Sequence, residues 1–390
     1  MQTASGKIII NYLRFLGISD DPASFLSVDE MKFITNSLTH NEERISDKRD
    51  EWGNWEHQFT KHNFSIPYLD QMVLRKAKEC GILRKAVWPG NAPFAFCLTH
   101  DLDVISDYDP KQLSRRYERM LAGANGLKKI QPFIFYCYSI LKSFIVNKKE
   151  DPLWYFERWC DAEKSLGFSS TFYVFVAEDK LHIYDCDLRI DDYLIFRGER
   201  ITLEQFIQKL NADGFEIGLH GSYLTFDNAE QFIKQKKMLE LIIGKAITTT
   251  RQHFLHYDIN STPQVHNEAG ILTDSTLGFN TTVGFRAGTC FPYFLNDNIL
   301  EVPQIIMDGA LFNSNSLAYN EAEAKQKIKD TIDLVEETGG CLVVNYHPNY
   351  INREIWWNSY TYLLDELKKR NAWCTSMNNI YKIARKICVE

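Results

Sequence analysis

Two aspartates stand where an apolar run of the sequence ends. The run begins at Phe94 and leads into Asp101 and Asp103, which are separated by a single residue. If the chain is extended there, both carboxylates leave the same side of a strand and converge at its C-terminal end. Because like charges this close raise one pKa unless a cation intervenes, the pair predicts a metal ligand beside a general base. The alternative is a solvated, Asp-rich turn that stops the strand.

Further polar side chains occur at or near the ends of other apolar runs. One histidine at such a place is more often structural than functional. In a barrel of parallel strands, however, the carboxyl ends of all strands meet at one face, where active sites of such barrels lie. We therefore expect these side chains to gather near Asp101. They are His220, Arg251, His253 and His347.

Strand-like runs alternate with amphipathic, helix-like patterns over most of the chain. The expected strands are 94–99, 171–176, 215–219, 248–255, 279–283, 302–307 and 341–346. The expected helices are 153–166, 202–213, 226–243, 262–270, 320–338 and 354–370, and several of them end at a glycine, which is typical of a helix C-terminus. This alternation predicts an α/β fold with a parallel sheet, and about seven such units predict a distorted or incomplete (β/α) barrel.

Residues 1–90 differ from this pattern. They combine helical periodicity around 28–38 with a charged stretch at 41–51 and an aromatic-rich segment after it. The turn chemistry of Pro89-Gly-Asn91 marks a natural boundary. We expect a small, mostly helical N-terminal subdomain over 1–90, with no role assigned to it, and the barrel over 91–390.

Composition excludes some partners and compartments. The net charge of −7, with Lys and Arg scattered along the 390 residues, argues against nucleic acid as a partner. Nine cysteines without a Cys-x-x-Cys pair predict reduced core residues of a cytoplasmic protein, and Asn11 and Arg14 interrupt the apolar N-terminus before it resembles a signal peptide. The apolar run 133–146 contains Lys142 and is too short to span a bilayer. It predicts a buried helix, with peripheral contact at the inner membrane as the alternative.

Five ordered motifs resemble the polysaccharide deacetylases of the NodB homology type, also called carbohydrate esterase family 4, over about residues 92 to 380. Thr99-His-Asp-Leu-Asp103 is similar to the first motif, Thr-Phe-Asp-Asp, with the two acids one residue further apart. Glu216-Ile-Gly-Leu-His220-Gly-Ser-Tyr-Leu224 is similar to the second, His-Ser/Thr-x-x-His, but Leu224 stands where the second histidine belongs. Arg251, Arg286 and His347 occupy the places of the key residues in the third, fourth and fifth motifs.

The resemblance implies a role for each of these residues. Asp101 becomes the general base, held by Arg251, and His347 the general acid. Asp103 and His220 become ligands of a divalent metal, with zinc preferred over cobalt, nickel or manganese. His253 shares strand parity with Arg251 and is our candidate for the missing ligand, the alternative being a hydrogen-bonding or substrate-contacting histidine. His256 has the opposite parity and is expected to be structural. Expected substrate contacts are Ser222, Tyr223 and Arg286.

The implied activity is the removal of N-acetyl groups, or alternatively O-acetyl groups, from a sugar or polysaccharide. The variant motifs look most like a branch associated with bacterial surface polysaccharides. Two other readings stay open. One is hydrolysis of a non-sugar C–N amide bond. The other is a degenerate domain that binds glycan or acts as a scaffold without catalysis, because one metal-binding histidine is missing.

Overall fold

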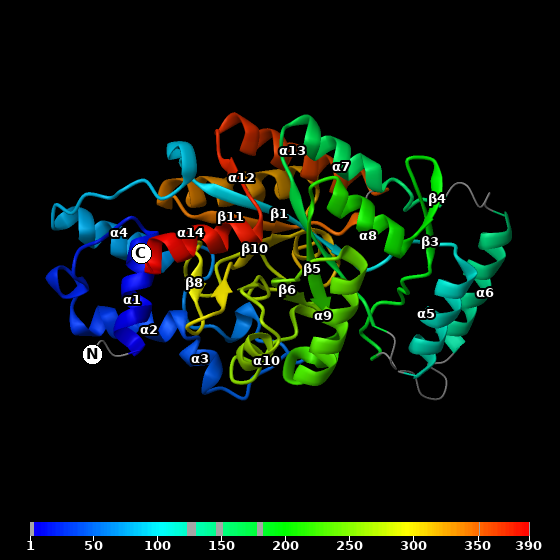
Figure 1. Cartoon of the computed structure of the whole chain (residues 1–390), viewed down its shortest axis with the longest axis horizontal. Helices are drawn as coiled ribbons and strands as arrows, with labels where there is room; N and C mark the ends of the chain where they lie inside the picture. The colour runs from blue at the N-terminus through cyan, green and yellow to red at the C-terminus, as the bar shows by residue number, and fades with distance from the viewer. Residues whose placement is uncertain (1–3, 123–129, 146–150, 178–181, 351, 390) are drawn as a thin grey trace.

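A curled, mostly parallel sheet forms the centre of the molecule. The computed structural model describes residues 4–122, 130–145, 151–177, 182–350 and 352–389. The strands lie in the order β10-β11-β1-β2-β5-β6-β7-β9-β8, and β12 pairs with β1. Figure 1 shows β1, β11, β10, β5 and β6 in the middle of the molecule. Among the described residues no pairing joins β10 to β8, so the barrel is incomplete, as predicted. The strands of this sheet are β1 (Ala95–Leu102), β2 (Ser170–Val174), β5 (Glu216–Gly221), β6 (Thr249–Gln252), β7 (Thr273–Asp274), β8 (Tyr293–Phe294), β9 (Leu300–Glu301), β10 (Gln304–Met307), β11 (Cys341–Asn345) and β12 (Trp373–Cys374).

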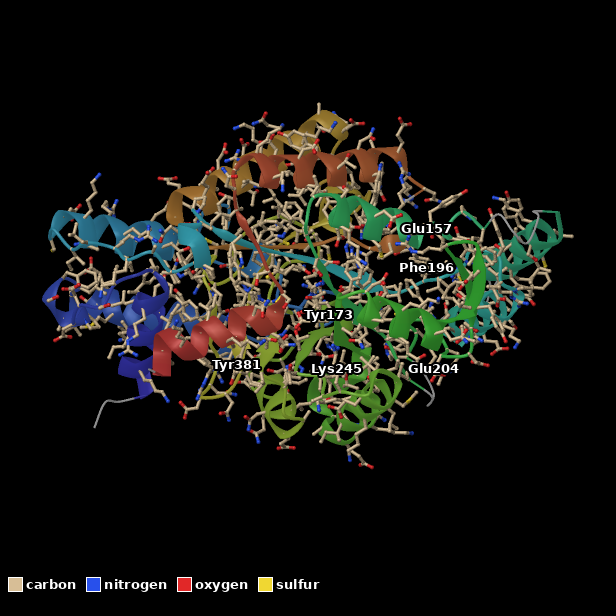
Figure 2. The ribbon with its side chains drawn as sticks, turned by 45° about the horizontal axis from the view of Figure 1, so that its top comes forward. Glu157, Tyr173, Phe196, Glu204, Lys245 and Tyr381 are labelled. Atoms are coloured by element: carbon tan, nitrogen blue, oxygen red, sulfur yellow. The ribbon has the colours of Figure 1, made fainter. Side chains whose placement is uncertain are left out.

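The central strands are buried on both faces, which explains why the sequence signals them clearly. All residues of β1, β2 and β11 are buried, and such strands are expected to read as nearly continuous apolar runs. Tyr173, near the centre of Figure 2, is one of the largest of these buried side chains. The strand expected at 279–283 is wrong. β7 lies beside β6 instead. The N–H of Asn280, within the expected strand, donates to Glu56 Oε1 of the N-terminal segment at 2.8 Å.

Helices cover the outside of the sheet, where the amphipathic patterns predicted them. Capping boxes at Thr202 and Asn320 fix the starts of α8 and α12. Gly244 and Gly339 end α9 and α12 in the left-handed conformation. The helices after β1 are α5 (Pro110–Ala122), α6 (Ile130–Ile145), α7 (Phe156–Ser165), α8 (Leu203–Ala212), α9 (Ala229–Ile243), α10 (Thr262–Glu268), α11 (Asp308–Phe312), α12 (Glu321–Thr338), α13 (Glu354–Lys369) and α14 (Met377–Val389). A small antiparallel hairpin of β3 (Tyr193–Phe196) and β4 (Glu199–Thr202) precedes α8.

The N-terminal segment packs against the barrel rather than apart from it. Its helices are α1 (Ala4–Phe15), α2 (Val28–Leu38), α3 (Asn41–Arg44) and α4 (Tyr68–Glu79), and α1 lies beside α14 at the other end of the chain (Figure 1). Leu13 and Phe15 belong to the same buried apolar cluster as Phe96 of β1 and Val343 of β11. The separate subdomain expected over residues 1–90 stays a prediction. The apolar core described for this segment is shared with the barrel.

The pair α5 and α6 projects from the barrel after β1, at the right of Figure 1. Six large apolar side chains of α6 are exposed, so the expectation that this run is a buried helix is wrong. Peripheral membrane contact by this helix stays a prediction, and α6 supplies the apolar face that such contact needs. Among the described residues, no helix is both long and apolar enough to cross a bilayer. The exposed residues are Ile130, Phe133, Ile134, Phe135, Tyr138 and Leu141.

One buried ion pair joins the N-terminal segment to the barrel and generates a stability prediction. Arg286 donates to both carboxylate oxygens of Glu43, at 2.7 and 2.8 Å, and both side chains are 2% exposed. Arg286→Met leaves the Glu43 carboxylate buried and unpaired, so we expect the free energy of unfolding to fall by about 3–5 kcal/mol in urea titrations. The double variant Glu43→Gln with Arg286→Met should recover much of that loss.

The exposed pair of Lys61 and Glu42 provides the matched control. The side chain of Lys61 is 85% exposed, so Lys61→Met should change the free energy of unfolding by less than about 1 kcal/mol. An Arg286→Met protein as stable as the parent would contradict the view that this pair anchors the segment.

Candidate active site

Polar residues in or just after the C-terminal ends of β1, β5, β6 and β11 meet at one end of the sheet. They line a pocket of about 140 Å³ together with apolar side chains of neighbouring loops. Parallel strands bring their carboxyl ends to one face, so residues far apart in the sequence converge there. Five of the residues that the sequence singled out are in this lining, namely Asp101, Asp103, His220, His253 and His347.

Asp101 is buried at the bottom of this pocket and is held on both oxygens. Its Oδ1 accepts a hydrogen bond from Arg251 Nη1 at 2.9 Å, and its Oδ2 accepts one from Asn345 Nδ2 at 2.7 Å. Burial alone would raise the pKa of this carboxyl, but Arg251, His220 and His347 outweigh it and lower the pKa. Asp101 is therefore an ionised, oriented acceptor with two fixed donors, which is the condition for a general base.

Arg251 reaches Asp101 from across the barrel. Its guanidinium also donates to Thr99 Oγ1 at 2.7 Å and to Ser275, and it lies 4.5 Å above the ring of Tyr173. The side chain is fully buried. Each nitrogen of the guanidinium thus has a protein acceptor, so Arg251 positions Asp101 and is not free to contact a substrate.

Asp103, His220 and His253 form a cluster with the donor atoms of a metal site. One ligand atom from each lies within 4.8 Å of the others. Asp103 Oδ1 is 3.4 Å from His220 Nε2 and 3.7 Å from His253 Nε2. Because His220 Nδ1 is 2.9 Å from the carbonyl oxygen of Arg251, the proton belongs on Nδ1 and the lone pair of Nε2 is directed at the cluster. One carboxylate and two imidazoles fit a divalent cation such as zinc, with positions left for water and substrate.

His253 comes into this cluster by a turn rather than by strand parity. β6 ends at Gln252, and the next two residues after His253, Phe254 and Leu255, have φ of +60° and +52°. This left-handed conformation costs free energy for non-glycine residues, so it persists only where neighbouring groups hold it. The carbonyl oxygen of Phe254 accepts from Asn54 Nδ2 at 3.0 Å and from Asn280 Nδ2 at 2.9 Å. The N-terminal segment therefore helps to fix the turn that presents His253.

Two neighbouring residues contact the cluster from the loop after β2. The thiol of Cys186 is 3.5 Å from both Asp103 Oδ1 and His253 Nε2, and burial raises its pKa, so it is a neutral donor. Asp185 Oδ1 lies 3.9 Å from His253 Nδ1. Although burial would raise the pKa of Asp185, His253 and two backbone N–H groups lower it. Asp185 thus places a negative charge behind the imidazole, where it favours an Nδ1–H tautomer.

His347 faces the cluster from the opposite side of the pocket. Its Nε2 is 3.6 Å from Asp103 Oδ2 and 3.9 Å from Asp101 Oδ2. Its Nδ1 is 2.6 Å from Asp308 Oδ1, and its backbone N–H donates to Asp308 Oδ2 at 2.7 Å. Burial alone would lower the pKa of His347, but Asp308, Asp103 and Asp101 raise it to about 10. In the metal-free protein this side chain is therefore an imidazolium at neutral pH.

The three expected substrate contacts do not line this pocket. Arg286 is bound to Glu43 and to the carbonyl oxygen of Gly278. Ser222 is bound through its N–H and its Oγ to the side-chain amide of Gln235. The hydroxyl of Tyr223 donates to the carbonyl oxygen of Trp52 at 2.6 Å. In this structure all three side chains are occupied by structural hydrogen bonds.

The residues beside Tyr223 also have structural surroundings. His256 stacks on the Tyr223 ring at 4.0 Å, and its Nδ1 is 2.8 Å from the Tyr223 carbonyl oxygen. Leu224, at the place of the expected second histidine, is 47% exposed and is not in the pocket lining.

Four residues of the site were missed by the sequence reasoning, namely Asn345, Asp308, Asp185 and Cys186. Asn345 lies two residues before His347, the key residue of the fifth motif, and this shared strand parity could have identified it. Asp308 follows the predicted strand 302–307 directly, so the rule that found Asp103 also applied to it. Asp185 and Cys186 have no comparable signal, because the loop after β2 carries no periodic pattern.

Comparison with solved structures identifies the fold. A candidate polysaccharide deacetylase from Mycobacterium smegmatis matches with a TM-score of 0.50 at 18% identity, covering 77% of this chain and 92% of that one. Another from Pseudomonas aeruginosa PAO1 matches with a TM-score of 0.50 at 14% identity, covering 80% and 97%. No protein-family model and no curated protein matches the sequence. The chain has the NodB-like polysaccharide deacetylase fold, which confirms the resemblance at the level of fold.

The contact between Asp308 and His347 generates a titration prediction. Asp308→Asn removes the negative charge closest to the ring, so the pKa of His347 in the metal-free protein should fall from about 10 towards the ordinary 6.5. NMR titration of the imidazole measures this shift. Asp308→Glu retains the charge and is the matched control. An unchanged pKa in Asp308→Asn would show that Asp308 does not hold the proton on His347.

Proposed function

We propose that this protein is a metal-dependent hydrolase that removes the acetyl group from an N-acetylated sugar or polysaccharide. The observation that carries the proposal is the convergence of three groups in one small pocket. These are an ionised carboxylate held by Arg251, a cluster of carboxylate and imidazole ligands, and a protonated histidine facing both. The fold shared with candidate polysaccharide deacetylases supports the substrate class.

Asp103, His220 and His253 are the residues that would hold the cation. A divalent ion bound there supplies Lewis acidity, which activates water and polarises the acetyl carbonyl group. His253 supplies the second imidazole ligand, which the second motif would place at position 224, where this chain has Leu224. Zinc suits this donor set, and cobalt, nickel and manganese are the alternatives.

Asp101 acts as the general base in this proposal. Its carboxylate takes the proton of the attacking water, while Arg251 and Asn345 fix the orientation of both oxygens. Because both donors remain bound throughout, the carboxylate needs no reorganisation before it accepts the proton.

His347 acts as the general acid. Its Nε2 faces the pocket and donates the proton to the departing amine nitrogen, while Asp308 keeps Nδ1 protonated and the ring in place. Apolar side chains beside it, Met307 and Leu255, limit the water that reaches the reacting atoms.

Release of acetate tests this mechanism. Asp101→Asn and His347→Ala should each lower kcat on the order of 10²–10⁴-fold with N-acetylglucosamine substrates, because each removes one proton-transfer group. Asp213→Asn, a partly exposed carboxylate at the end of α8, is the matched control and should retain full activity. Release of ammonia or another amine from small amides, without acetate release from any sugar, would favour the non-sugar amide hydrolase instead.

Metal content separates an enzyme from a degenerate scaffold. The parent protein should bind about one divalent ion per chain by elemental analysis, and His253→Ala, like His220→Ala, should lose most of it. His256→Ala is the control, because His256 lies in the neighbouring stack and not in the cluster. A parent protein that binds no divalent ion even when zinc is supplied would support the non-catalytic alternative.

A further inference from the structure

The outer face of α6 is built from large apolar side chains. Ile130, Ile134, Tyr138 and Leu141 follow one another at intervals of four, four and three residues, so they lie on one side of the helix. Each of these residues is more than half exposed, with values from 52% for Ile130 to 63% for Leu141. The proposed mechanism uses none of them. A continuous apolar face is therefore left exposed on the pair α5 and α6, which projects from the barrel (Figure 1).

The opposite face of α6 carries small polar side chains. Ser139 and Ser143, four residues apart, are buried, and Tyr136 stacks on Tyr117 of α5 with the ring centroids 4.4 Å apart. In an ordinary surface helix, the apolar stripe faces the core and the polar side chains face the water. In α6 the small hydroxyl groups face inward and the large apolar side chains face outward. This polarity suits a helix whose outer face meets an apolar medium.

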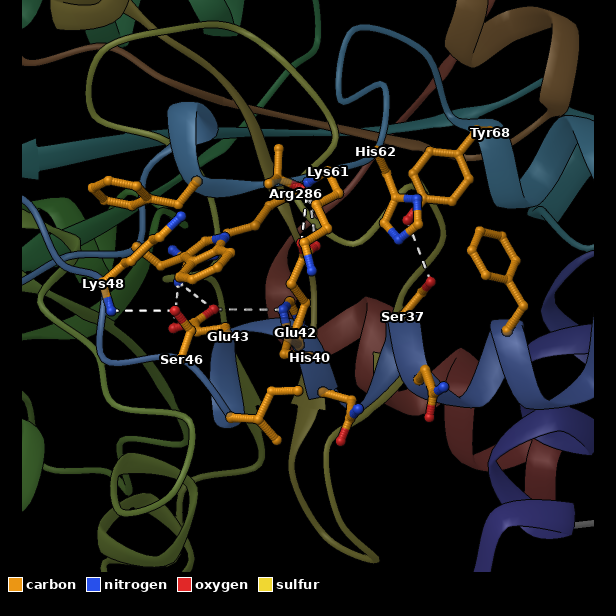
Figure 3. A pocket seen from close by; sticks show the side chains of 17 residues that line it. Ser37, His40, Glu42, Glu43, Ser46, Lys48, Lys61, His62, Tyr68 and Arg286 are labelled. Carbon is orange, nitrogen blue, oxygen red and sulfur yellow. Dashed lines mark hydrogen bonds and ion pairs between the residues drawn. The ribbon is translucent and has the colours of Figure 1, made fainter.

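Exposed apolar residues are not gathered in this way elsewhere. Among the described residues, every other helix or strand has at most one large apolar residue that is exposed. Ile45, for example, lines a hollow in the N-terminal segment together with charged groups such as Arg286 and Glu43, which pair with each other (Figure 3). Single exposed apolar residues are ordinary, whereas a contiguous apolar patch marks an interaction surface. In the described part of the chain, α6 is therefore the element suited to an apolar partner.

The sequence around α6 is strongly basic. Residues 110–150 contain nine Lys and Arg but two acidic residues, whereas the whole chain has a net charge of −7. α6 itself contains no acidic residue. Basic residues around an apolar helix face fit a bilayer that contains anionic lipids. A second copy of this chain would bring the same positive charge, which disfavours an interface between copies. The lysines within α6 and next to it in the sequence are Lys128, Lys129, Lys142, Lys148 and Lys149.

α5 ties α6 to the loop that follows β2. Arg119 of α5 donates to Asp187 Oδ1 and Oδ2, both at 2.9 Å, and to the carbonyl oxygen of Ile183 at 2.7 Å. The same loop carries Asp185 and Cys186, which lie beside the proposed metal cluster. A surface that binds α6 is therefore connected to the candidate active site by defined contacts.

We infer that α6 is a membrane-binding helix that lies flat on a bilayer containing anionic lipids. Its 16 residues extend about 24 Å along the surface. The apolar outer face enters the boundary between headgroups and acyl chains, and the surrounding lysines are attracted to the lipid phosphates. The inference goes beyond the proposed deacetylation and does not depend on it, because no residue of the catalytic pocket takes part.

Flotation of the full chain with lipid vesicles tests this inference. The parent protein should float with vesicles of phosphatidylcholine and phosphatidylglycerol in equal parts. Binding should fall several-fold with pure phosphatidylcholine or at high salt, because both weaken the attraction to the lysines. Ile134→Gln combined with Leu141→Gln should lower the partition coefficient for the mixed vesicles by about tenfold or more, since two large apolar side chains no longer enter the bilayer.

A second double variant keeps the test independent of how the first one folds. Ile130→Gln combined with Phe133→Gln changes two other exposed residues of α6 and should weaken vesicle binding in the same way. Leu83→Gln combined with Leu241→Gln is the matched control. Both leucines are highly exposed, at 87% and 84%, and both lie outside α5 and α6. This control should bind vesicles as the parent does.

Each outcome supports or overturns the inference. A parent protein that does not float with the mixed vesicles overturns it, as does equal binding to pure phosphatidylcholine or unchanged binding in both α6 variants. Sedimentation velocity without lipid tests the competing occupant. A parent dimer that binds no vesicles, and that both α6 variants convert to a monomer, would assign the face to a second copy instead. Binding lost in both α6 variants and kept in the control supports the inference, whether or not the protein releases acetate.

Discussion

The buried contact between Arg251 and Asp101 is the constraint on which the site depends. Removing either charge from water is costly, and each side chain is acceptable in the interior only because the other is there. Since Asp101 leaves β1 and Arg251 leaves β6, the pair also fixes how the two strands face one another across the sheet. Thr99, Ser275 and Asn345 complete the hydrogen bonds of the pair. The chemistry proposed for Asp101 thus depends on these buried neighbours as well as on the carboxylate itself.

The N-terminal segment acts on the site from outside the barrel. Glu43 holds Arg286, Glu56 binds the loop at Asn280, and Asn54 binds the carbonyl oxygen of Phe254. α1 packs against β8, the edge strand that has no pairing with β10 among the described residues. A segment that the sequence leaves without a role therefore holds two loops, at Phe254 and at Asn280, that line the pocket of the proposed ligands.

The barrel and the core of the site could be predicted from the sequence because burial leaves a clear pattern in the central strands. β1 and β11 are buried on both faces, so their apolar runs are unambiguous, and the side chains at their ends must share an edge. It failed where long-range contacts decide the conformation. The segment 279–283 has the composition of a strand but is fixed by Glu56. Arg286 sits at the expected motif but is paired with Glu43, a partner 243 residues away. The sequence of α6 predicts a buried helix because its apolar residues lie on all sides. In the fold, however, one face of α6 is exposed.

The carbonyl oxygen of Phe254 limits which substitutions the turn around His253 can tolerate. One acceptor is shared by an amide from the N-terminal segment and an amide from a barrel loop, and the turn it stabilises carries His253. Substitutions at Asn54 and at Asn280 are therefore not independent of each other. A chimera that exchanged the first ninety or so residues for those of another barrel would lose the geometry of the proposed cation site, unless the replacement brought its own donor to that one oxygen.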